Sequence, residues 1–407
     1  MKRTTDPETL GFATARLDRI DRHFARYVDD GRLAGWQIVV TRRGEVAHAS
    51  TYGLRDREAG LPVEDDTLWR IYSMTKPLTA VAAMMLWEEG AFQLTDEISR
   101  WIPSFADARV FVKGTLTKPV SVPATEPIRI WHLLTHTSGI TYPFLQTTTV
   151  DALYRAAGLP LSFPRDMPLD VMCDTVAGLP LVFQPGSAWC YGLSLDVLGR
   201  LVEVVSGQTL EEFFAERILG PLGMHDTAWW VDEDKAVRLA ALYAAGPSQQ
   251  AVRQDALGDL IRTRPAGFEG GGGLVSTAAD YHRFTQMLLR GGELDGVRLL
   301  SPRTVRWMTR NQLPGGAEIP QVRNGGMTEY NYDGVGFGFA MAVVMESRAS
   351  NMYASPGEFH WGGLASTAFW VDPVEQVTAM LFTQLMPSST HPLRPQLRQL
   401  VYSALVD

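Results

Sequence analysis

The chain of 407 residues is poor in cysteine and lysine, and it contains no long apolar run. Its two cysteines, Cys173 and Cys190, form no metal-ligand pattern, so we expect them to be reduced structural thiols. No segment reaches the ~18 apolar residues of a membrane-spanning helix, and no apolar stretch follows the N-terminal Met1–Pro7 as it would in an export signal. We therefore expect a cytoplasmic protein that does not bind membranes.

Acidic residues outnumber basic ones. The formal net charge is -8 and no basic block is present, which argues against a nucleic-acid partner. With 45% hydrophobic and 20% charged residues, the composition is that of a globular protein with an ample core. The length indicates two domains or one large composite, and nothing in the sequence predicts the oligomeric state.

Both chain ends carry strand patterns, and the middle of the chain carries helical ones. A helix pattern over Leu17–Val28 precedes two strands, Trp36–Thr41 and Val46–Thr51, which are joined by a hairpin turn. Near the C-terminus we expect three antiparallel strands and a closing helix, over Phe337–Met345, Leu364–Val371, Gln376–Gln384 and His391–Val406. Helical patterns separated by Pro/Gly-rich loops cover Ile128–Leu134, Leu195–Val205, Leu210–Ile218 and Ala278–Leu289.

This layout predicts an α/β (α+β) protein in which an antiparallel sheet is flanked by helices. The α/β domain would be built from residues 1–90 and 270–407, and residues 91–269 would form a mainly helical insertion domain.

The most informative segment is Ser73-Met74-Thr75-Lys76, at the start of an apolar helix pattern. A serine hydroxyl is a poor nucleophile unless a base lies within hydrogen-bond reach, and positions i and i+3 of a helix share a face. Burial lowers the pKa of a lysine and can make it a base, whereas an arginine stays charged. The alternative is a lysine that reaches solvent from the helix start. Only Lys76 lies in an apolar helix pattern, since the other lysines are Lys2, Lys113, Lys118 and Lys235.

Several further segments accompany this motif in a fixed order: Leu133–Gly139, Phe183–Ser187 leading to Tyr191, Gly270–Thr277 and Trp361–Gly363. Together they resemble the serine β-lactamase and penicillin-binding-protein superfamily, specifically the class C-like branch that includes the family VIII carboxylesterases. The resemblance extends from about Leu17 to the C-terminus. It implies the β-lactamase/penicillin-binding-protein-like fold, a covalent mechanism without metal or cofactor, and a small-molecule ester as substrate.

The resemblance also implies roles for individual residues. Ser73 would be the nucleophile, and Lys76 and Tyr191 would share its proton. The backbone N–H groups of Ser73 and Leu364 would form the oxyanion hole, and Gly362 and Gly363 would let the strand approach closely.

Two departures from the antibiotic-handling members favour an esterase. Trp361-Gly362-Gly363 stands where those members carry Lys-Thr-Gly, and Tyr191-Gly192-Leu193 lacks their asparagine. Both changes remove polar recognition of an amide antibiotic, so we expect weak or no β-lactamase activity. Small acyl groups are expected in an apolar cleft lined by Tyr142, Phe144, Trp189 and Trp361.

The sequence also bears on other mechanisms and functions. No G-x-S-x-G nucleophile elbow is present to support a Ser-His-Asp hydrolase. His132 and His136 have a zinc-like spacing, but no acidic residue lies between them and no third ligand suggests itself. An acyltransferase of the same fold stays open because it would use the same catalytic residues. A D-amino-acid peptidase and a non-catalytic binding protein are less consistent with the motifs.

Overall fold

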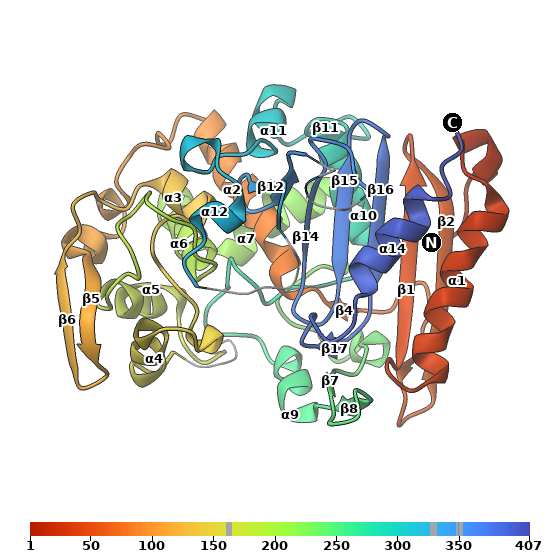
Figure 1. Cartoon of the computed structure of the whole chain (residues 1–407), viewed down its shortest axis with the longest axis horizontal. Coiled ribbons are helices and arrows are strands. Elements are labelled where there is room, and N and C mark those ends of the chain that lie inside the picture. Colours follow the sequence, from red (N-terminus) through yellow and green to blue (C-terminus); the bar gives the residue numbers. More distant parts are fainter. Residues whose placement is uncertain (160–164, 326–331, 347–348, 350–352) are drawn as a thin grey trace.

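The computed structural model describes residues 1–159, 165–325, 332–346, 349 and 353–407. In this part of the chain, an eight-stranded sheet runs in the order β12-β13-β14-β15-β16-β1-β2-β3 (Figure 1). Every neighbouring pair in it is antiparallel. The strands come from both chain ends: β1 Gly35–Arg42, β2 Glu45–Asp56, β3 Leu61–Pro62, β12 Val335–Phe337, β13 Ala342–Val344, β14 Phe359–Gly362, β15 Ala368–Asp372 and β16 Val377–Phe382.

Helices cover both faces of this sheet. On β1, Ile38 and Val40 belong to a core shared with α1 (Thr14–Asp29) and α14 (Leu393–Tyr402), which lie together over one face in Figure 1. Val39 between them belongs to the larger core on the other face, together with residues of α2 (Lys76–Glu88) and α10 (Ala278–Leu289). Alternate side chains of a strand point to opposite faces, so every residue of β1 is buried. The prediction of an antiparallel sheet flanked by helices is confirmed.

The two chain ends meet beside α1. The Ala13 N–H donates to the Ala404 carbonyl (2.8 Å). Arg42 at the end of β1 donates to the Asp407 carboxylate. These contacts fix the C-terminal helix against the N-terminal one.

The middle of the chain is mainly helical. Its longer helices are α3 (Ile130–Leu134), α4 (Thr149–Ala156), α5 (Leu169–Ala177), α6 (Ser194–Ser206) and α7 (Leu210–Phe214). A hairpin of β5 (Arg109–Thr115) and β6 (Lys118–Pro123) projects from its far side (Figure 1). The boundaries 91 and 269 of an insertion domain stay a prediction.

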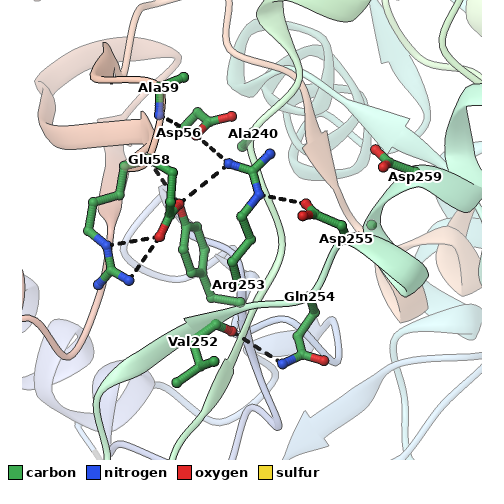
Figure 2. Close-up of polar contacts among 12 residues, drawn as sticks. Asp56, Glu58, Ala59, Ala240, Val252, Arg253, Gln254, Asp255 and Asp259 are labelled. Atoms are coloured by element: carbon green, nitrogen blue, oxygen red, sulfur yellow. Dashed lines mark hydrogen bonds and ion pairs between the residues drawn. The ribbon is translucent and has the colours of Figure 1, made fainter.

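One part of this middle segment attaches to the sheet side. Strand β7 (Tyr243–Ala245) pairs with β8 (Ala251–Arg253) and, in parallel, with β17 (Leu385–Met386). Figure 2 shows Arg253 contacting Asp56 at the end of β2, together with Glu58 and Asp255. Tyr243 also donates to Glu58 (2.7 Å), so this small sheet is tied to the end of β2 by side chains as well as by β17.

The structure corrects several predicted boundaries. Phe337–Met345 is not one strand, because the chain reverses between β12 and β13, where Ala340 has φ +62° and Gly338 N–H donates to Met341 O. Leu364 lies in a turn, and β15 starts only at Ala368 because Ser366 N–H closes the turn onto Gly363 O. The closing helix is α14, which is shorter at both ends than His391–Val406. Beyond α7, the predicted helix 210–218 continues as a π-helical turn.

No helix in the described residues is long and apolar enough to span a membrane. The cytoplasmic location stays a prediction.

Candidate active site

Ser73 lies in a tight turn between the two parts of the molecule. The turn Tyr72–Thr75 is a 3₁₀ helix that leads directly into α2. Tyr72 has φ +43°, an unfavourable value for a residue with a side chain, and such strain is tolerated only where the surroundings enforce it. Residues Lys76 to Leu86 of α2 are all buried, so the helix that carries Lys76 is anchored in the core on every side. The nucleophile candidate is therefore held on rigid backbone.

Lys76 is fully buried, with 0% of its surface exposed, and its Nζ donates to three oxygen atoms. These are Ser73 Oγ at 3.1 Å, Tyr142 Oη at 2.9 Å and the Gly271 carbonyl at 2.5 Å. The carbonyl can only accept, whereas both hydroxyl groups can also donate. A neutral Lys76 can therefore keep an N–H on Gly271 and direct its lone pair at the Ser73 proton.

Tyr191 supplies a second polar contact to the same serine. Its hydroxyl donates to Ser73 Oγ at 2.6 Å, and the Lys76 Nζ lies 4.7 Å from the centre of its ring. The ring is packed between Trp189 (6.3 Å, stacked) and Trp361 (5.4 Å, tilted). The structure thus brings together Ser73, Lys76 and Tyr191, the three residues predicted to take part in the proton transfer.

Burial sets the protonation states around Lys76. Desolvation lowers the pKa of Lys76 to about 7, and the negative charges of Asp196 and Glu269 oppose this shift. Desolvation also raises the pKa of Asp196 to about 6, against the attraction of Lys76 and the Gly271 N–H. Burial, followed by the charge of Asp196, raises the pKa of Glu269 well above its usual value, which favours its protonated form. Burial keeps Tyr142 a neutral phenol by raising its pKa.

The turn after β14 approaches the Ser73 turn closely. A Cβ atom on Gly363 would lie 2.3 Å from both the Ile71 carbonyl and Thr367 Oγ1, so only glycine fits. Among the described residues, neither the Ser73 N–H nor the Leu364 N–H has an acceptor in the protein. Two free N–H groups on adjacent segments are what an oxyanion hole requires, although the role itself stays a prediction.

The predicted pocket residues occupy different places. Trp361 packs on Tyr191 and on Phe337 (5.4 Å each), and Phe144 stacks on Tyr142 (4.6 Å). Tyr142 is more than a pocket wall, because its hydroxyl contacts Lys76. Trp189 is 1% exposed and stacks on Tyr191, and its role in the pocket stays a prediction.

Sequence reasoning missed Asp196, Glu269 and the Gly271 carbonyl. The signal that the sequence offers for Asp196 is an isolated acid in the first turn of the apolar helix α6. Gly271 belongs to the glycine run, whose function the sequence did not predict. A Cβ atom on Gly271 would lie 2.5 Å from Asp196 Oδ2 and 2.9 Å from Tyr142 Oη. The glycine therefore allows the carboxylate, the phenol and the lysine to converge.

The histidines offer no base for Ser73. Burial and the Lys76 charge place the pKa of His136 well below its usual value, and its Nδ1 accepts the Gly192 N–H at 3.4 Å. His132 Nδ1 accepts the Arg129 N–H at 3.0 Å. No hydrogen bond joins a histidine to Ser73 in the described part of the chain, and no cluster of three or more potential metal ligands occurs there.

The chain is similar to known proteins over nearly its whole length. A beta-lactamase family model matches residues 20–403. The chain belongs to this family. Protein Rv1367c of Mycobacterium tuberculosis is 37% identical over 91% of this chain and 90% of its own length. Esterase EstB of Burkholderia gladioli is 31% identical and covers 98% of both chains. The structure of EstCE1, described as a hydrolase with promiscuous acyltransferase activity, superposes with a TM-score of 0.80 at 25% identity over 97% of this chain and 99% of that one.

Proposed function

We propose that the protein is a serine carboxylesterase that hydrolyses small, short-acyl esters through an acyl-enzyme on Ser73. One observation carries this proposal: a fully buried lysine with a pKa of about 7 lies 3.1 Å from a serine hydroxyl that also receives a hydrogen bond from Tyr191. A base with a pKa near the working pH is the most effective one for general base catalysis. The full-length similarity to Esterase EstB supports the same reaction class.

The acylation half-reaction follows from these contacts. Ser73 Oγ attacks the ester carbonyl carbon as its proton passes to Lys76, and the new oxyanion is received by the N–H groups of Ser73 and Leu364. The C–O bond to the alcohol then breaks, and the leaving oxygen takes a proton from Tyr191 or Lys76. The acyl group remains on Ser73.

Deacylation repeats these steps with water as the nucleophile. Water gives up a proton to the Lys76–Tyr191 pair, attacks the acyl carbon and releases the acid. Ser73 recovers its proton, which closes a ping-pong cycle.

Acyl transfer is the second candidate, because an alcohol can replace water in the second half-reaction. The acyltransferase activity named for EstCE1 favours keeping it. β-Lactamase activity is expected to be weak or absent, since Trp361 and Leu193 stand where a lysine and an asparagine would bind an amide antibiotic.

The test is hydrolysis of p-nitrophenyl butyrate by the wild type and by Ser73→Ala. We expect kcat/KM to fall by about 10⁴-fold or more in the variant. Ser403→Ala, at the end of α14, is the control and should match the wild type. Activity that survives in Ser73→Ala would mean that the nucleophile is misassigned. Longer p-nitrophenyl esters test the acyl preference, nitrocefin tests β-lactamase activity, and product analysis with added methanol separates transfer from hydrolysis.

A further inference from the structure

Within the described residues Lys76 contacts no carboxylate directly, but Gly271, whose carbonyl it contacts, is hydrogen-bonded to one. Asp196, in the first turn of α6, accepts the Gly271 N–H with Oδ1 at 2.8 Å. Gly271 in turn accepts the Lys76 N–H at 2.5 Å. Hydrogen bonds to an ionised acceptor are stronger than those between neutral groups. Gly271 is therefore fixed at its N–H by a carboxylate and at its carbonyl by the lysine.

The second oxygen of Asp196 faces the same group of atoms. Asp196 is fully buried, and its Oδ2 has no hydrogen-bond partner in the described residues. The position that a Cβ of Gly271 would take lies 2.5 Å from this oxygen and 2.9 Å from Tyr142 Oη, which contacts Lys76. Leaving a buried carboxylate oxygen without a donor is unfavourable. The Asp196 carboxylate therefore lies close to Lys76 without contacting it, although its burial is unfavourable.

Burial disfavours a charge on the other titratable groups around Lys76. Burial favours the neutral forms of Tyr142 and Glu269 by raising the pKa of each, and the charge of Asp196 acts on the pKa of Lys76 more strongly than that of Glu269. His136 is neutral because burial lowers its pKa. The groups that face Lys76 or Asp196 from the surrounding elements are Ser73, His136, Tyr142, Cys173, Tyr191 and Glu269, with Arg165 and Arg200 acting at the periphery.

We propose that Asp196 is a positioning residue for the Ser73 reaction: it fixes the Gly271 carbonyl against Lys76 and balances the lysine charge while Lys76 holds the serine proton. This inference rests on the proposed function, because it assumes that Lys76 is the base. In the acylation step, negative charge grows on the substrate oxygen and positive charge on Nζ. Asp196 stabilises the second of these charges through space.

Asp196→Asn separates this role from a purely structural one. The asparagine keeps an oxygen that accepts the Gly271 N–H, and its uncharged NH₂ group takes the place of the second carboxylate oxygen. Without that charge the ammonium form of Lys76 is less stable, so Lys76 becomes neutral at lower pH. A unit charge at close range shifts a pKa by about one unit or more.

The assay measures covalent labelling of Ser73 by a fluorophosphonate, followed by mass spectrometry as a function of pH. In this reaction the Oγ–P bond forms and fluoride leaves, so no ester turnover is needed. We expect the acid limb of the labelling rate in Asp196→Asn to move to lower pH by about one unit or more. The plateau rate should fall, because a weaker base transfers the proton less readily.

Asp280→Asn is the matched control. Asp280 also lies in the first turn of a helix, is buried, and accepts a backbone N–H, that of Asp226 at 2.8 Å. The acids whose charges act on Lys76 are Asp196 and Glu269, not Asp280. The labelling profile of Asp280→Asn should superimpose on that of the wild type.

Two results would overturn the proposal: an unshifted acid limb in Asp196→Asn, or an equal shift in Asp280→Asn. If Asp196→Asn does not fold, Asp196→Glu replaces it. Asp196→Glu keeps the charge but displaces it, so the acid limb of its labelling profile should stay in place while the plateau rate falls. An acid limb shifted as far as predicted for Asp196→Asn would also count against the proposal. A wild type that is labelled at Ser73 but hydrolyses no ester would refute the proposed function alone.

Discussion

Gly363→Ala tests how the sheet contributes to catalysis. The added methyl group would lie 2.3 Å from the Ile71 carbonyl and 2.3 Å from Thr367 Oγ1, so the turn after β14 has to move away from the Ser73 turn. Leu364 is the next residue, and its N–H is one of the two expected oxyanion donors. Losing one such donor costs about 2.7–4 kcal/mol of transition-state stabilisation, which corresponds to 10²–10³ in kcat. We therefore expect kcat for p-nitrophenyl butyrate to fall by this factor while KM changes little.

Gly178→Ala is the control for this prediction. Gly178 follows α5, has a negative φ of -74°, and a Cβ there would meet its nearest atom at 3.5 Å, an ordinary contact distance. This variant should keep the wild-type kcat and melting temperature. The reasoning would be refuted if folded Gly363→Ala, verified by circular dichroism, retained kcat within threefold of the wild type, a margin set well below the loss expected for one donor.

Two further predictions concern the lysine base and the buried ion pair between Arg398 of α14 and Glu358. The kcat/KM of the wild type should rise with pH through a value near 7, because Lys76 accepts the serine proton only when neutral. Lys76→Arg should lower kcat by about 10²–10⁴, since a guanidinium stays charged. A flat pH profile or an active arginine variant would contradict this reasoning. Arg398→Met should lower the free energy of unfolding, measured in urea, by about 3–5 kcal/mol, because it leaves the wholly buried Glu358 without its cation. Arg264→Met breaks a pair between an exposed arginine and the partly exposed Glu211, so it should cost about 1 kcal/mol or less. Similar losses in both variants would contradict the argument.

Local sequence patterns predicted those parts of the fold that depend on neighbouring residues. The helix over Ala278–Leu289 has the predicted bounds, and β1 and β2 form the predicted hairpin. The division of Phe337–Met345 was not predictable in this way, since the chain turns at Ala340, an alanine with a positive φ. The attachment of β7 to β17 was also hidden, because a pairing between segments far apart in sequence leaves no periodic signal.

Local sequence patterns likewise predicted only some of the residues of the active site. Ser73 and Lys76 are three residues apart, so their contact was predictable from helical spacing. Tyr191 was nominated only through the resemblance to a family. Asp196 and Glu269 would have been taken for a helix-start acid and a loop acid, and only tertiary packing buries them near Lys76. Their effect on the lysine therefore depends on contacts that no local pattern records.

The identity of residue 361 bears on which substrates the site can accept. Trp361 packs between Tyr191 and Phe337, and its Nε1 is buried without a partner in the described residues. A substrate carboxylate placed here would lose its hydration and meet an indole instead of a cation, which is unfavourable. A neutral ester has no such charge to desolvate. Discrimination between the two would then arise from the unpaired charge in the wrong substrate, which selects more strongly than small differences in apolar fit.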